Sequence, residues 1–179
     1  MRALLQLSRF IDRINDRLGM LANWAVVHAC AISAGNAMIR YAFDLSSNAW
    51  LEVQWYLFTA VVMLGASYTL QKNEHVRVDI FYMRLSERGK EWLDLLGTIV
   101  FLVPTMSLLA YLAWPLFRDA WRIQEMSSNA GGLLRWPVTI MLPLGFCLVA
   151  LQGISEIIKR AAALRGEVKF VTTYERPLQ

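Results

Sequence analysis

The sequence predicts an all-α integral membrane protein with four membrane-spanning helices, preceded by an amphipathic helix, and with both termini in the cytoplasm. Hydrophobic residues make up 56% of the 179 residues and charged residues only 18%, against about 25% charged residues in soluble domains. The apolar residues gather in four stretches that contain no Asp, Glu, Lys or Arg. The positive charges concentrate in alternate connections between these stretches. This composition excludes a disordered chain and an ordinary soluble globule.

The first predicted element is an amphipathic helix at the start of the chain. Apolar residues recur there at three- and four-residue spacing, whereas the charged residues largely occupy other faces. The apolar residues are Leu4, Leu7, Ile11, Ile14 and Leu18. This pattern is typical of a helix that lies in the membrane interface, although a frayed cytoplasmic leader stays open. Charges every few residues argue against a cleaved signal peptide.

The four uncharged stretches predict the membrane spans. About 20 residues of helix cross a bilayer core, and these stretches are 19 to 23 residues long. They cover residues 18–39, 53–71, 95–117 and 136–155. We expect a single membrane domain over residues 1–165 and a cytoplasmic tail over residues 166–179.

The connections carry signals for where helices begin and end. Ser86 can cap a helix that runs into the third span. The third helix can continue from Arg118 to Glu125 before the sequence SSNAGG breaks it. Pro137 suits the first turn of the fourth helix, where its missing N–H is harmless.

The distribution of positive charge predicts the orientation. Of the 18 Lys and Arg residues, 14 lie in the N-terminal segment, the second connection and the tail, and four lie in the other two connections. Short connections rich in Lys and Arg stay in the cytoplasm, so both termini are expected there. The net charge of +4 is therefore a topology signal and does not indicate nucleic-acid binding, which would need basic stretches interleaved with stacking aromatics.

The spans themselves offer little chemistry. His28 is their one titratable side chain apart from tyrosines and cysteines, and a hydrogen bond to a neighbouring group or a helix contact explains it best. Cys30 and Cys147 lie within spans, where a thiol behaves as a small apolar residue. The sequence contains no catalytic motif and no Cys/His metal spacing. We therefore expect neither an enzyme, nor a metal site, nor a cofactor.

The ends of the second span hold the candidate partner contacts. Small residues around Gly65 can let a neighbouring helix approach closely, either inside this chain or from a partner. Arg77 and Asp79 share one side if that segment is extended, and they can pair with each other, with a partner or with solvent. The candidate set is Glu52, Trp55, Gly65, Tyr68, Lys72, His75, Arg77 and Asp79.

The same region resembles a known family. In the run from Asn48 to Tyr82, Glu52 opens the second span, the motif LGASYTL covers Leu64–Leu70, and HVRVD follows from His75 to Asp79. This run resembles the small membrane subunit (DctQ type) of tripartite ATP-independent periplasmic (TRAP) transporters. The run from Arg135 to Lys159 is similar to the fourth helix of that family.

The resemblance implies a role and partners. It implies a small permease subunit in the inner membrane, beside a large elevator-type membrane subunit and a periplasmic solute-binding protein, in the ion-driven uptake of organic acids by symport. The bilayer is its other partner. A stand-alone four-helix channel or redox subunit remains the alternative, and a haem band or conductance without a partner would favour it.

Overall fold

The computed structural model describes residues 1–45, 47–75, 82, 84–129 and 131–168. The helices in order are α1 (Arg2–Phe43), α2 (Asn48–Lys72), α4 (Glu87–Gly97), the π-helical segment η1 (Thr98–Leu102), α5 (Val103–Arg122), α6 (Trp136–Thr139) and α7 (Met141–Leu164). Within the described part of the chain, four helical stretches are long and apolar enough to cross a membrane: α1, α2, the stretch Glu87–Arg122 and the stretch Trp136–Leu164. Each contains one predicted span, and the all-α class is confirmed.

The amphipathic segment and the first span form one continuous helix. The hydropathy pattern predicts two elements here, but residues 1–34 contain no proline and only one glycine, Gly19. Nothing in this stretch therefore breaks the helix. The 42 residues of α1 extend about 63 Å at 1.5 Å per residue, roughly twice the thickness of a bilayer core. The helix must therefore lie obliquely or extend beyond the membrane.

The predicted helix boundaries are largely confirmed. The Ser86 side chain accepts a hydrogen bond from the Gly89 amide at the start of α4. From there α4, η1 and α5 run on without interruption to Arg122, so the helix ends three residues before the expected Glu125. Pro137 lies in the first turn of α6. The helix stops before Glu125 because Gln124 adopts a left-handed backbone conformation, with φ 50°, which is typical of helix C-termini.

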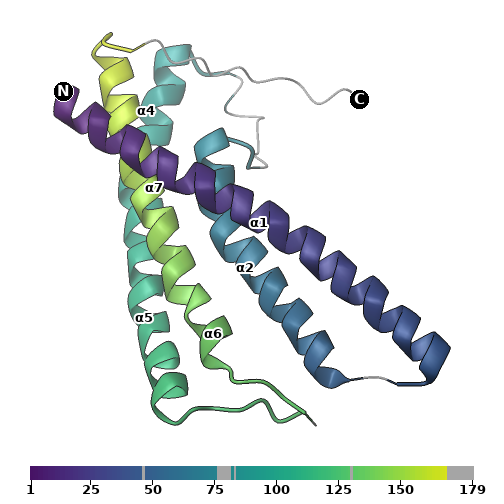
Figure 1. The fold of residues 1–179 in the computed structure, drawn as a ribbon. Helices are drawn as coiled ribbons and strands as arrows, with labels where there is room; N and C mark the ends of the chain where they lie inside the picture. Colours follow the sequence, from purple (N-terminus) through teal and green to yellow (C-terminus); the bar gives the residue numbers. More distant parts are fainter. Residues whose placement is uncertain (46, 76–81, 83, 130, 169–179) are drawn as a thin grey trace.

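The helices form two oblique pairs (Figure 1). α1 and α2 lie side by side as an antiparallel pair, and α5 packs against α7. The N-terminal half of α1 crosses α7, which also contacts α2. A Cβ atom added to Gly145 of α7 would lie 2.9 Å from the backbone oxygen of Met63. Glycine is thus required there for α2 and α7 to approach this closely.

The interior combines small apolar residues with many polar side chains, and the exterior is largely apolar. The largest fully buried side chains are Gln152, Asn15, Ser8, Ser67 and Ser155. Among the described residues, a small cluster of buried apolar residues consists of Ala22, Leu64 and Leu148, whereas large side chains such as Phe101 are exposed. Soluble proteins show the reverse distribution. Apolar surroundings suit such a surface, so the structure and sequence together describe a multi-pass membrane protein.

Candidate functional site: polar networks at both ends of the helices

One network centres on Glu52, near the start of α2. Its carboxylate accepts hydrogen bonds from the Ser127 hydroxyl, from Asn129 Nδ2 at 2.8 Å and from the Leu133 amide at 2.7 Å. All three donors come from the connection between α5 and α6, more than 70 residues away along the chain. Glu52 is only 3% exposed. One carboxylate therefore organises a whole connecting segment.

That segment is folded as a short hairpin, which we call the connector hairpin (residues 125–129 and 131–135). Met126 and Leu134 form an antiparallel bridge, and an ion pair joins Arg135 to Glu125. The Tyr56 hydroxyl, one helical turn after Glu52, donates to the Leu134 carbonyl at 3.0 Å. The second helix thus holds the hairpin through two side chains on one face.

A second network lies at the other end of the helices and centres on Asp12 of α1. Asp12 Oδ1 accepts from Gln152 Nε2 at 3.1 Å, from the Ser155 hydroxyl at 2.9 Å and from Lys159 Nζ at 3.1 Å. These three residues project from one side of α7 at helical spacing. The network ties the N-terminal half of α1 to α7.

Buried polar groups extend this second network. Asn15 Nδ2 donates to Gln152 Oε1 at 2.6 Å, and the hydroxyls of Ser8 and Ser155 lie 2.7 Å apart. Gln152 also donates to Glu156. Buried polar groups stabilise a structure only when their hydrogen bonds are made. The α1–α7 crossing is therefore specific in register and not a loose apolar contact.

Ion pairs at the same end join the remaining helices. Arg160 Nη1 of α7 lies 2.7 Å from Asp94 Oδ2 of α4, and both side chains are largely buried. Asp16 of α1 accepts from Lys72 and Gln71 of α2, each at 3.1 Å. Polar side chains thus join α1 to α2 and to α7, and α4 to α7, at this end.

The comparison with known families decides the assignment. The model of the DctQ component of tripartite ATP-independent periplasmic transporters matches residues 29–163. The chain belongs to the DctQ family. The match includes Glu52, the connector hairpin and Gln152, but begins after Asp12 and Asn15. No curated protein matches the chain.

Several predicted contact residues of this DctQ chain lie against its own first helix. The nearest atom to a Cβ added at Gly65 is the Cβ of Ala22, at 4.0 Å, so the small-residue patch packs inside the chain. Tyr68 covers Gly19, where an added Cβ would lie 2.6 Å from its ring. Lys72 lies 5.0 Å from the centroid of that ring. These residues order the α1–α2 pair, and a partner contact by them stays a prediction.

The other candidates divide into two groups. Trp55 is 62% exposed, and His75 is also exposed, so both side chains are available to a partner. Arg77 and Asp79 lie outside the residues that the structure describes. Their predicted pairing therefore stays a prediction.

Sequence reasoning missed the Asp12 network, although a signal for it exists. Ser8, Asp12 and Asn15 follow one another at spacings of four and three residues, and so do Gln152, Glu156 and Lys159. Polar residues that recur at helical spacing share one side of their helix and mark a candidate polar face. The apolar residues of the same segment drew attention to the adjacent face, where Leu4 and Leu7 are exposed.

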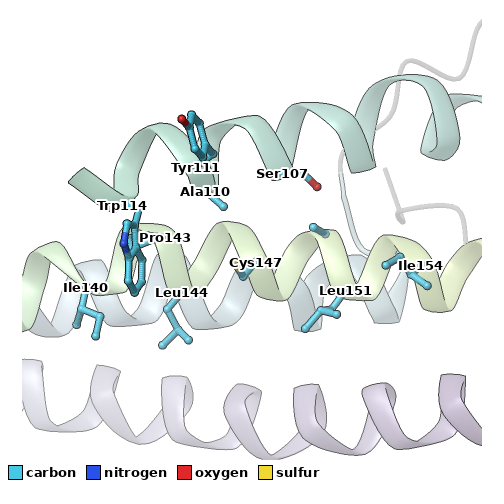
Figure 2. A pocket seen from close by; sticks show the side chains of 11 residues that line it. Ser107, Ala110, Tyr111, Trp114, Ile140, Pro143, Leu144, Cys147, Leu151 and Ile154 are labelled. Carbon is cyan, nitrogen blue, oxygen red and sulfur yellow. The ribbon is translucent and has the colours of Figure 1, made fainter. Parts of the chain in front are cut away.

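A largely apolar hollow lies between α5 and α7 (Figure 2). Its volume is about 650 Å³ and its lining includes Ala110, Trp114, Leu144 and Cys147. No Asp, Glu, Lys, Arg or His lines it. Such a hollow can take an acyl chain or an apolar side chain, but it offers no charged group to a solute or an ion.

Proposed function

We propose that this DctQ-family chain is the non-catalytic small permease subunit of a TRAP-type secondary transporter in the cell inner membrane. It acts as a fixed scaffold beside a large elevator-type membrane subunit. The complex takes up an organic acid by symport, driven by an ion gradient, after a periplasmic binding protein has delivered it. Family membership supports the class of complex, and the contacts described above support the scaffold role.

The observation that carries the scaffold role is the fixing of the helices at both ends. The Glu52 network clamps α2 to the connection between α5 and α6. The Asp12 and Arg160 contacts clamp α1 and α4 to α7. Buried polar networks whose groups are mostly paired hold elements in one arrangement; in the α1–α7 network Asn15 Oδ1 is a buried acceptor without a hydrogen-bond partner among the described residues. A subunit of this kind suits a stationary support against which a transport domain moves.

The connector hairpin suits a second part of the role. The charge distribution predicts that the Glu52 end faces the periplasm. A hairpin held by Glu52 and Tyr56 would then offer an ordered polar surface to the binding protein. Ordered surfaces bind with a smaller entropic cost than mobile loops.

Reconstitution tests the proposal. The proposed large subunit is placed in proteoliposomes with or without this chain, together with the binding protein and an ion gradient. We expect solute uptake from the pair and none from this chain alone. Uptake or ion flux by the isolated chain would refute a scaffold role. A haem absorption band in the purified chain would favour the stand-alone redox alternative instead.

A further inference from the structure

His28 is a polar side chain on the outer surface of the first span that neither network uses. The residue lies near the middle of the uncharged stretch 18–39 and its side chain is exposed. The only hydrogen bond that the structure gives this ring, within the described residues, joins Nδ1 to the Trp24 carbonyl oxygen at 2.7 Å. The imidazole is thus fixed to its own helix.

This hydrogen bond determines what the other ring nitrogen can do. A carbonyl oxygen only accepts, so Nδ1 must carry the hydrogen. In the neutral ring Nε2 is then an acceptor with a free lone pair. The described part of the chain supplies no donor to it. The first span therefore presents an unsatisfied acceptor on its outer surface.

Lipid alone does not satisfy this acceptor. The hydrocarbon core is about 30 Å thick, so a group at mid-depth lies roughly 15 Å from either headgroup layer. Acyl chains contain no hydrogen-bond donors, and a polar group without a partner in hydrocarbon is costly. A donor at this depth must come from another protein helix or from water that such a helix encloses.

The surface around His28 is suited to a close helix contact. Trp24, His28, Ala31 and Gly35 follow one another at spacings of four, three and four residues and therefore share one side of α1; we call this the His28 face. Trp24 is 58% exposed, and a Cβ added to Gly35 would meet nothing within 4 Å. Ala31 and Gly35 form a small-xxx-small pair, which lets helix backbones approach closely in membranes.

The His28 face differs from the face that packs inside the chain. Ala22, Ala25 and Ala29 are buried on the side of α1 that lies against α2. A Cβ at Gly35 would have no comparable contact, so nothing in the described part of the chain explains a glycine there. A glycine in a helix interior costs up to about 1 kcal/mol relative to alanine.

We propose that the His28 face binds one transmembrane helix of the large membrane subunit, and that this helix donates a hydrogen bond to His28 Nε2. A hydroxyl, amide or indole N–H supplies the donor, and Ala31 and Gly35 let the two backbones approach. The inference rests on the proposed function, since it names the face that the large subunit occupies. A second copy of this chain is the competing occupant.

Four variants test the contact in the co-expressed pair, one of them a control. His28→Leu removes the acceptor, and His28→Gln keeps one. We expect His28→Leu to weaken recovery of the large subunit about 3- to 20-fold, the range for one hydrogen bond between membrane helices, and His28→Gln to retain most of it. Gly35→Leu should also reduce recovery, whereas Ala34→Leu on another exposed side of the same helix should not. Circular dichroism and size exclusion of each isolated chain check that it still folds.

A photo-crosslinking side chain at Ala31 identifies the occupant, with Ala34 as the matched control position. A crosslink from position 31 to the large subunit supports the proposal, and a crosslink to a second copy of this chain overturns it. If the unmodified chain recovers the large subunit but His28→Leu behaves identically and position 31 forms no product, the inference fails alone. If the unmodified chain recovers no large subunit, the proposed function fails with it.

Discussion

Glu52 concentrates three long-range hydrogen bonds on one carboxylate, from Ser127, Asn129 and the Leu133 amide. In a Glu52→Ala variant the connector hairpin loses all three. We expect faster hydrogen exchange at the Leu133 and Arg135 amides, because the hairpin then opens locally far more often. Uptake by the reconstituted pair should fall as well. Hydrogen exchange by mass spectrometry, with peptides covering residues 123–136, measures the change.

The matched control for this prediction is Glu74→Ala. Glu74 is an exposed acidic residue just beyond the other end of α2. Its replacement should leave exchange in the connector hairpin as it is. Unchanged protection of the hairpin in Glu52→Ala would show that the backbone contacts and Tyr56 hold it without the carboxylate.

Gly19 is required because the Tyr68 ring lies against its Cα. A Cβ at this position would lie 2.6 Å from two ring atoms. Gly19→Ala should therefore destabilise the folded chain by about 1–3 kcal/mol, the usual cost of overpacking. Gly97→Ala is the control, since an added Cβ there meets nothing within 4 Å. Unfolding titrations in mixed micelles give both values.

A double-mutant cycle with Tyr68 separates this clash from a helix-propensity effect. In a Tyr68→Ala background the ring is gone, so Gly19→Ala should cost less than in the native chain. Equal costs in the two backgrounds would contradict the packing explanation.

At the scale of elements, the N-terminal half of α1 depends on its polar contacts with α7. Asp12→Ala removes an acceptor shared by Gln152, Ser155 and Lys159. A hydrogen bond to a charged group is worth about 1.5–3 kcal/mol, so we expect a destabilisation in this range. Spin labels near the start of α1 and the end of α7 should also move apart. Electron spin resonance distance measurements detect such a separation.

Asp16→Ala provides the comparison on the same helix. The Asp16–Lys72 pair is exposed, with 50% and 39% of the two side chains accessible, and exposed pairs contribute at most about 1 kcal/mol. A destabilisation as large as that of Asp12→Ala would show that solvent exposure does not determine how much these contacts contribute to stability.

The elements could be predicted from the sequence to the extent that their signals are local. The four spans follow from uncharged stretches, and the Ser86 cap and the Pro137 turn follow from single residues. The unbroken length of α1 was not predicted, because the change from charged to apolar residues at Leu18 resembles a boundary while the backbone has no reason to stop there. Hydropathy changes at that point and helix propensity does not.

At the scale of the whole molecule, the site could be predicted only in part. Glu52 stands out in the sequence as a carboxylate beside an apolar stretch, but its donors lie more than 70 residues away. No local pattern reports which distant loop meets it. Gln152 was likewise hidden inside a predicted span, and its role appears only once α1 crosses α7. Contacts between distant segments depend on how the helices pack, which hydropathy does not encode.

The arrangement of the whole chain in the membrane leads to the last prediction. The Asp12 network and the connector hairpin lie at opposite ends of the helices. The segments at the Asp12 end carry 14 of the Lys and Arg residues, and the connections at the hairpin end carry four. The charge rule predicts the Asp12 end in the cytoplasm. In a chain with Cys30 and Cys147 replaced by serine, a cysteine at Ser128 should react with a membrane-impermeant maleimide in intact spheroplasts. A cysteine at Gln6 should react only after the membrane is permeabilised. Both positions are exposed, so burial does not explain a difference in labelling between them. The reverse labelling pattern would invert the proposed topology and place the connector hairpin out of reach of a periplasmic partner.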